Sequence, residues 1–159
     1  MFRQLKFDAN GGKKLSWFNA EVAPGETIGK LPTVGKKKYA FKGWYTQKKG
    51  GKKISAKTKI TQNQTVYARW KKISVKRASA PTVKKAGKGK TSGAKVYQIT
   101  YSTSPKFTGS KKITAKSLKK TIRKLKEGKT YHVKVRAYKL DSLKQKVYGK
   151  YSKTVKVKL

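Results

Sequence analysis

The stretch KEGKTYHVKVRAYK, residues 126–139, decides the fold class of the second half of the chain. Apolar side chains recur there at every second position, with mostly basic residues between them. Successive side chains of a β-strand point to opposite faces, so this alternation predicts a strand with one buried face and one basic outer face. The apolar positions are Tyr131, Val133, Val135 and Ala137, and the outward positions are His132, Lys134, Arg136 and Tyr138.

The charge of the chain is extreme. Its 159 residues include 44 Lys and Arg against 5 Asp and Glu, a net charge of +39. Hydrophobic residues still make up 35% of the chain and aromatic residues 11%, which is typical of a folded protein rather than a disordered basic tail. Nearly all the positive charge is lysine, which favours diffuse attraction to a polyanion over recognition of a single phosphate or base.

Several classes of protein are excluded or disfavoured. The chain has no cysteine, so disulfides and thiolate metal sites are impossible. No apolar run approaches the ~18 residues of a membrane span. A strand-like segment begins at residue 2, which leaves no room for a signal peptide, so we expect an exported parent protein to be longer than this chain.

The sequence predicts two domains, residues 1–72 and 73–159, with a mainly β fold. All three tryptophans lie in the first part, yet both parts are basic: 18 basic and 3 acidic residues in 1–72, and 26 and 2 in 73–159. In the first part Leu5 and Phe7 alternate before Asn10-Gly11, a strong turn signal. Residues 26–30 can form at most a short helical turn, so we expect an α+β or mainly β unit.

Four motifs of the first part occur in order: FDANGG (7–12), GETIGKLP (25–32), YAFKGWYT (39–46) and TVYARW (65–70). Together they resemble a Listeria–Bacteroides repeat of the internalin B-repeat type, over essentially residues 2–72. The resemblance implies a β-grasp-like α+β module from an extracellular bacterial surface protein. One position departs from the family, which usually has glycine where Lys38 stands here.

The second part is predicted to be an antiparallel β-sandwich of about seven strands. Residues 125–137 resemble the tyrosine corner and following strand of a fibronectin type III domain, with Tyr131 as the structural corner residue. Residues 96–107 and 148–157 are similar to the third and last strands of that family. The tryptophan usual on its second strand is missing. We therefore expect either that residues 72–78 and 81–86 form the first two strands or that the second strand is shortened. Residues 113–117 and 119–125 are expected to form later strands.

Catalysis is not expected, and neither is a cofactor or a metal. The acidic residues are scattered, so no carboxylate pair for acid–base chemistry is evident. The single histidine, His132, lies between basic residues on the predicted outer face and has no partners for a triad or metal site. It is expected to be an exposed strand residue.

The basic faces of the predicted strands are the candidate site. Lysines on outer faces can bind a polyanion, or can simply prevent edge-to-edge aggregation of sheets. The summed charge favours polyanion affinity, because a long-range field needs no single geometry. The candidate polyanion-binding residues are Arg123, Lys134, Arg136, Lys156 and Lys158.

The aromatic pair Trp17-Phe18 is a second candidate site. It can contact a protein partner or a sugar ring, or it can fill a small hydrophobic core. Trp44 and Trp70 are assigned to the core.

These observations predict a non-catalytic pair of modules from a bacterial cell-surface or secreted protein, located outside the cell or in its wall. By resemblance, such modules are spacers or adhesion elements. By charge, they should bind anionic wall polymers or host glycosaminoglycans, and nucleic acid non-specifically in vitro. The alternatives are a nucleic-acid-binding protein and an accessory region of a secreted cell-wall enzyme.

Overall fold

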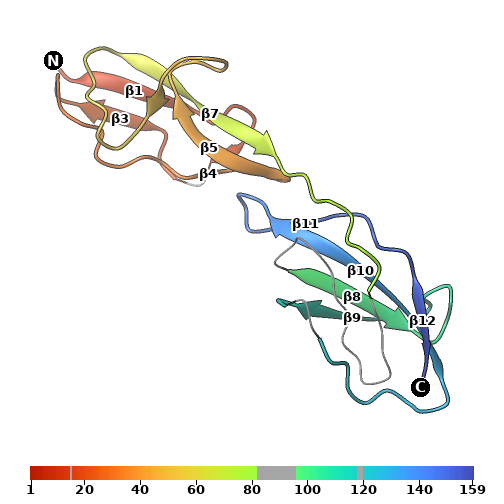
Figure 1. Ribbon diagram of the computed structural model, residues 1–159. Helices are drawn as coiled ribbons and strands as arrows, with labels where there is room; N and C mark the ends of the chain where they lie inside the picture. Colours follow the sequence, from red (N-terminus) through yellow and green to blue (C-terminus); the bar gives the residue numbers. More distant parts are fainter. Residues whose placement is uncertain (15, 82–95, 118–119) are drawn as a thin grey trace. The chain divides into compact units, whose positions relative to one another are not determined.

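A computed structural model describes residues 1–14, 16–81, 96–117 and 120–159. Its contacts divide the chain into two compact units, which are described separately. Unit 1 comprises Met1–Ile73 and Leu140–Gln145, and unit 2 comprises Ser74–Lys139 and Lys146–Leu159. The regular elements of the described residues are all strands (Figure 1), so the mainly β prediction is confirmed.

Unit 1 contains a five-stranded sheet in the order β3-β1-β7-β5-β6 and a small two-stranded sheet of β2 and β4. The first strand of the unit, β1, lies between β3 and β7. It pairs antiparallel with β3 and parallel with β7. The strands are β1 (Arg3–Asp8), β2 (Lys13–Lys14), β3 (Asn19–Val22), β4 (Val34–Gly35), β5 (Tyr39–Tyr45), β6 (Lys53–Ile54) and β7 (Gln64–Lys72).

The core of unit 1 lies on one face of its larger sheet. Leu5 and Phe7 are buried there as their alternation predicts, and Val66 and Ala68 of β7 are fully buried beside them. Apolar side chains from the loops between strands complete this core: Ile28, Leu31 and Ile60. Because alternate residues of these strands go to the core, the residues between them form a second, polar face of the sheet.

The α+β expectation for unit 1 is wrong, because the described residues contain no helix. The segment predicted as a helical turn is extended instead. Thr27 forms a β-bridge with Lys59, and the Ile60 amide donates to the Glu26 carbonyl at 3.0 Å. Gly29 has a φ of +71°, outside the right-handed helical region. The backbone of residues 26–30 therefore forms hydrogen bonds with the segment around Lys59 and Ile60 instead of local helical hydrogen bonds.

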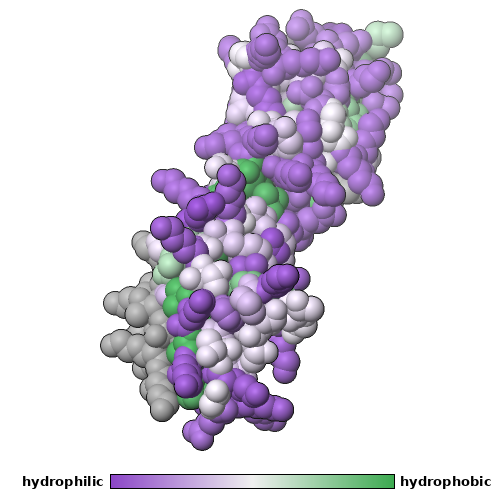
Figure 2. Space-filling view, turned by 90° about the vertical axis from the view of Figure 1, so that its right-hand side faces the viewer, coloured by the Kyte–Doolittle hydropathy of each residue, from purple (hydrophilic) through white to green (hydrophobic). Residues whose placement is uncertain are grey.

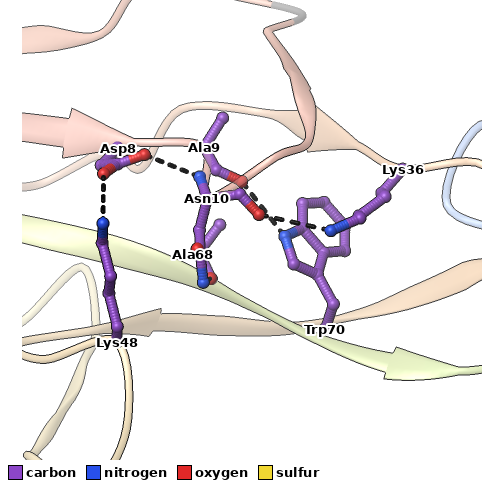
Figure 3. Close-up of polar contacts among 7 residues, drawn as sticks. All are labelled: Asp8, Ala9, Asn10, Lys36, Lys48, Ala68 and Trp70. Atoms are coloured by element: carbon purple, nitrogen blue, oxygen red, sulfur yellow. Dashed lines mark hydrogen bonds and ion pairs between the residues drawn. The ribbon is translucent and has the colours of Figure 1, made fainter.

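The Asn10-Gly11 turn after β1 forms as predicted, with φ values of 48° and 75°. It is also tied to β7 by side chains (Figure 3): Asn10 Nδ2 donates to the Ala68 carbonyl at 3.0 Å. The indole nitrogen of Trp70 donates to the Ala9 carbonyl at 3.1 Å. These side-chain hydrogen bonds connect the turn after β1 to β7, in addition to the backbone hydrogen bonds between the two strands.

Lys38 takes a left-handed backbone conformation, which favours glycine. Its φ is +66°, and the turn closes with a hydrogen bond from the Tyr39 amide to the Lys36 carbonyl at 3.1 Å. A left-handed conformation costs a residue with a Cβ ~1 kcal/mol. The Lys38 amide also donates to Asp141 Oδ2 at 2.8 Å, a contact within unit 1 that offsets part of that cost.

Asp141 is a buried carboxylate, with 5% of its surface exposed. Burial raises its pKa, but amide donors from Lys38, Gln145 and Leu143, together with the charge of Lys37, outweigh that effect. The pKa of Asp141 is therefore below its ordinary value.

Unit 2 contains an antiparallel sheet in the order β11-β10-β8-β9, with β12 also paired to β10. Its strands are β8 (Tyr97–Ser102), β9 (Lys111–Ala115), β10 (Thr130–Leu140), β11 (Lys146–Tyr148) and β12 (Val155–Lys158). The predicted inward residues of β10 are all buried. They pack with side chains of β8 and β9 in two clusters, which contain Tyr97, Ala115, Val135 and Ala137, and Tyr101, Tyr131 and Val133.

Two of the predicted strands of unit 2 are wrong. Residues 73–78 form no strand, although Val75 and Ala78 pack on the core. Residues 120–125 also form no strand, and the positive φ of Lys124, 60°, interrupts any extended run there. In both segments the apolar residues are used for packing without a ladder. The strand predicted over residues 81–86 lies outside the described residues from residue 82 on. Residue 119, the first residue of the strand predicted over 119–125, also lies outside them.

Candidate polyanion-binding face

Four of the five predicted basic residues share one face of the unit 2 sheet. Lys134 and Arg136 point outward from β10, opposite its buried residues. In the antiparallel pairing of β10 with β12, His132 lies opposite Lys156 and Thr130 opposite Lys158. Residues directly opposite each other point to the same face. Arg123 is exposed but lies in the non-strand segment before β10, so it is not part of this surface.

Lys112 is a fifth member that the prediction missed. It lies opposite Thr100, which in turn lies opposite Lys134. The alternation of Ile113 and Ala115 in the sequence is the signal that could have found it. We call the surface formed by these residues the basic face: Lys112, Lys134, Arg136, Lys156 and Lys158.

Lys134 and Arg136 are held between aromatic rings. The Lys134 ammonium lies 3.7 Å from the ring centre of Phe107 and 4.7 Å from that of Tyr151. The Arg136 guanidinium lies 3.7 Å from the ring centre of Tyr148 and 4.6 Å from that of Tyr151. Cations and rings therefore alternate along the face, and both cations are only half-exposed.

Gln98 fixes this row from the neighbouring strand. Its Oε1 accepts from Nε and Nη2 of Arg136 at 2.9 and 2.8 Å. The Tyr151 hydroxyl is within hydrogen-bond distance of both Thr100 Oγ1 and Gln98 Oε1, at 3.2 and 3.4 Å. The two cations thus have fixed positions, whereas Lys112, Lys156 and Lys158 are exposed.

His132 was expected to be exposed, and that prediction is wrong: only 7% of its surface is exposed. It faces the same side as Lys134, but β10 lies between β8 and β12 at this point. Neighbours Ser102 and Lys156 stand directly beside it. A central strand loses exposure even on the outer face of its sheet.

No acidic side chain lies on the basic face, and all the acidic residues of the chain are among those described. Asp8, Glu21, Glu26 and Asp141 belong to unit 1, and Glu127 lies in the turn before β10. The ion pair between Lys48 and Asp8, at 3.9 Å, joins two well-exposed side chains of unit 1. The side chains of the basic face therefore carry a net positive charge, which attracts anions.

Figure 2 shows how hydrophilic and hydrophobic residues are distributed over one face of the molecule. Hydrophilic residues cover most of the visible face, and they are interspersed with pale residues of intermediate hydropathy and with a few hydrophobic ones. Tyrosine and threonine, which accompany the cations of the basic face, belong to that intermediate class.

The predicted partner-contact aromatics are divided between core and surface. Phe18 packs against the unit 1 core, 6.1 Å from Trp44 between ring centres. Trp17 is 39% exposed and makes an edge contact with Phe7 at 5.5 Å. Trp44 is buried and Trp70 is partly buried. A role for Trp17 in contacting a partner stays a prediction.

The described residues offer little for other chemistry. Across the four described ranges, no group of three or more His, Cys, Asp or Glu side chains is placed to hold a metal ion. A search of the same residues found no helix with the length and apolar character needed to span a membrane.

Comparison with known proteins found a family model that matches part of the chain. Residues 4–69 match the Listeria-Bacteroides repeat domain, which covers nearly all of the unit 1 sheet. This repeat is typical of bacterial surface proteins. No curated protein and no solved structure matches the chain.

Proposed function

We propose that the chain is a non-catalytic pair of modules from a bacterial cell-surface or secreted protein, and that it binds anionic polymers outside the cell. The observation that carries the proposal is the basic face, where five cations lie together without a carboxylate. The polymers are anionic wall polymers or host glycosaminoglycans. As a spacer or adhesion element, the chain would hold such a polymer through many salt-sensitive contacts.

We further propose that unit 2 is a fibronectin type III-like domain. Two features support it. The strand order β8-β10-β12 is antiparallel throughout, as expected for the sheet formed by the third, sixth and seventh strands of such a sandwich. The Tyr131 hydroxyl accepts a hydrogen bond from the Lys126 amide at 3.0 Å, which is the geometry of a tyrosine corner.

The fixed positions of Lys134 and Arg136 should lower the entropy cost of binding a polyanion at the basic face. Ordering a long lysine or arginine side chain on binding costs ~0.5–1.5 kcal/mol. Phe107, Tyr148 and Tyr151 have already ordered Lys134 and Arg136, so this cost is reduced for the two central cations. The three exposed lysines can adapt to the spacing of charges on the ligand.

The test is a salt titration of binding to teichoic acid, heparin and double-stranded DNA. A variant that replaces Lys112, Lys156 and Lys158 with Gln is compared with a control that replaces Lys76, Lys111 and Lys120. The control loses the same charge from exposed positions outside the face. We expect the face variant to bind more weakly than the control, and its salt slope on DNA to fall by about 3. If both variants lose the same affinity, binding depends on the net charge of the chain and not on the basic face.

A nucleic-acid-binding protein is the second candidate function, because the basic face attracts the phosphates of any nucleic acid. Bases stack on open aromatic faces. Here Lys134 and Arg136 already occupy faces of Phe107, Tyr148 and Tyr151, which disfavours base stacking at these rings. DNA retained above teichoic acid and heparin at physiological salt would favour this candidate. An accessory role beside a wall hydrolase would be tested on the full parent protein.

A further inference from the structure

A further cation of unit 2 lies next to the basic face, beyond Arg136. Tyr138 is the next outward residue of β10, because it follows the buried Ala137. The ammonium of Lys146, at the start of β11, lies 4.9 Å from the ring centre of Tyr138. The Tyr138 ring in turn lies 5.6 Å from that of Tyr148, which covers the Arg136 guanidinium. Lys146 therefore continues the alternation of cations and rings past Arg136.

One cation lies at each successive outward position of β10. Outward positions of a strand are about 6.8 Å apart, because each residue adds about 3.4 Å. The resulting row follows β10 for about 27 Å, and we call it the cation track. Its members, from one end to the other, are Lys146 beside Tyr138, Arg136, Lys134, Lys156 beside His132, and Lys158 beside Thr130.

The cations follow the strand direction and not the direction across the sheet. The outward positions of the neighbouring strand β8 are uncharged: Gln98, Thr100 and Ser102. Lys112 lies beyond them on β9, two strands and about 9.6 Å away from Lys134. A bound polymer therefore meets a cation at every step along β10, but it meets a neutral strand when it crosses the sheet.

An acidic residue lies at one end of the cation track. The Gly128 amide donates to the Leu159 carbonyl at 2.9 Å, and the Leu159 amide donates to the Lys129 carbonyl at 3.1 Å. These bonds hold the turn that contains Glu127 next to the end of β12, just beyond Lys158. A carboxylate there repels a further anionic group of a ligand. We therefore expect a ligand to use five charges and to gain little from a sixth.

We propose that the cation track binds a single flexible polyanionic chain that lies along β10 and carries one anionic group about every 7 Å, and that Lys146 is a binding residue of this site. Duplex DNA carries one charge per ~1.7 Å of its axis, so most of its charges would find no partner on the track. A chain with one phosphate or sulfate per repeat of matching length can place an anion beside each cation. The proposal rests on the proposed affinity for polyanions, and it adds the charge spacing of the ligand, its direction and Lys146.

The experiment measures binding of the full chain to abasic oligomers of 1,3-propanediol phosphate with two to eight phosphates, at fixed ionic strength. Each repeat has six backbone bonds, as many as two residues of a polypeptide, so its extended length is about 7 Å. A second series joins the same numbers of phosphates by 12-carbon linkers, which more than doubles the spacing. A third series, of oligosaccharides with one sulfate per sugar residue, distinguishes sulfate from phosphate as the anionic group.

The site variant is Lys146→Gln, and the matched control is Lys111→Gln. Both are exposed strand residues of unit 2, but Lys111 lies opposite Tyr101, whose side chain belongs to the core on the other face of the sheet. Lys112→Gln tests the direction of the bound chain, because Lys112 belongs to the basic face but not to the cation track. Lys158→Gln repeats the test at the other end of the track, and thermal unfolding checks that every variant folds.

For the parent, we expect the affinity for propanediol phosphate to rise about 1.5- to 5-fold with each added phosphate, as for exposed ion pairs, and to level off near five phosphates. Lys146→Gln and Lys158→Gln should each level off near four. Lys111→Gln should follow the parent, and Lys112→Gln should weaken all lengths without moving the plateau. The 12-carbon series should gain much less with each phosphate.

A plateau at five charges in the phosphate or the sulfate series supports the cation track, and the series that binds more tightly identifies the anionic group. Equal effects of Lys146→Gln and Lys111→Gln would overturn the track, as would an equal gain per phosphate in the 12-carbon series. A shorter plateau with Lys112→Gln would overturn the direction along β10. If the unaltered chain binds neither these oligomers nor teichoic acid, heparin and DNA, the proposed function itself fails. If it binds them without a plateau, only the track is refuted.

Discussion

Gly12 is where a single methyl group should destabilise unit 1 most selectively. A Cβ built there would lie 2.4 Å from Trp70 Cζ2, 3.1 Å from Trp70 Cη2 and 3.0 Å from the Ala9 carbonyl oxygen. The φ of Gly12 is not in the left-handed region, so the conflict is steric rather than conformational. The indole cannot yield freely, because it donates to the Ala9 carbonyl and packs on Phe41 with 5.4 Å between ring centres.

The expected cost of Gly12→Ala follows from these contacts. Forcing a methyl group into packed space costs ~1–3 kcal/mol. Displacing the indole also breaks its hydrogen bond to Ala9, worth ~1 kcal/mol. We therefore expect Gly12→Ala to lower the free energy of unfolding of unit 1 by about 2–4 kcal/mol.

The assay is chemical denaturation followed by tryptophan fluorescence. All the tryptophans, Trp17, Trp44 and Trp70, belong to unit 1, so the signal reports that unit alone. The same measurement is made on Trp70→Phe and on the double variant Gly12→Ala with Trp70→Phe, which completes a double-mutant cycle. Phenylalanine lacks the indole atoms nearest to the new methyl, so in that background Gly12→Ala should cost less than about 1 kcal/mol. The control Gly25→Ala has nothing within 4 Å of its Cβ and tests backbone strain alone.

The reasoning is refuted if Gly12→Ala costs the same in both backgrounds, because the indole would then not be the obstacle. A cost no larger than that of Gly25→Ala would also contradict it. Either result would mean that the turn between Asn10 and β2 adjusts without disturbing Trp70.

Three further outcomes are expected. Tyr131→Phe removes the acceptor of the Lys126 amide and should destabilise unit 2 by about 1 kcal/mol, seen as faster hydrogen exchange in β10 while the tryptophan signal is unchanged. Because the pKa of Asp141 is lowered in the folded chain, the carboxylate stabilises the fold above its unfolded pKa of ~3.9, and this stability is lost as the pH falls through the folded value. Thermal unfolding is measured for the parent and for Asp141→Asn at pH 6 and at pH 2.5. The parent should be more stable than the variant only at pH 6. Added salt should raise the melting temperature without any ligand, since the net charge of +39 repels itself, and an unchanged melting temperature would show that this repulsion does not limit stability.

Local patterns predicted what depends on neighbours in sequence. The period-two alternation around Phe7 and Val135 gave the buried faces correctly, and Asn10-Gly11 gave its turn. The alternation also gave Lys134 and Lys156 outward positions in their strands. The pairing of these strands then places both residues on the basic face.

What failed depended on neighbours in space. His132 is covered because its strand is central, which its own alternation does not reveal. The rings beside Lys134 and Arg136 include Phe107 and Tyr151, which lie outside the strands and outside any periodic pattern. The side chain of Lys53 lies over Gly43 at a β-bulge that no spacing indicates.

The parallel pairing of β1 with β7 determines how unit 1 responds to mechanical load. The chain enters the sheet at the start of β1 and leaves it at the end of β7, and these two strands run side by side in the same direction. Pulling on the two ends therefore slides one strand along the other. The ladder bonds from Leu5–Gln64 to Asp8–Tyr67 are loaded together in shear rather than opened one after another. A module stretched between a cell and its surroundings would resist such a pull with the whole ladder at once.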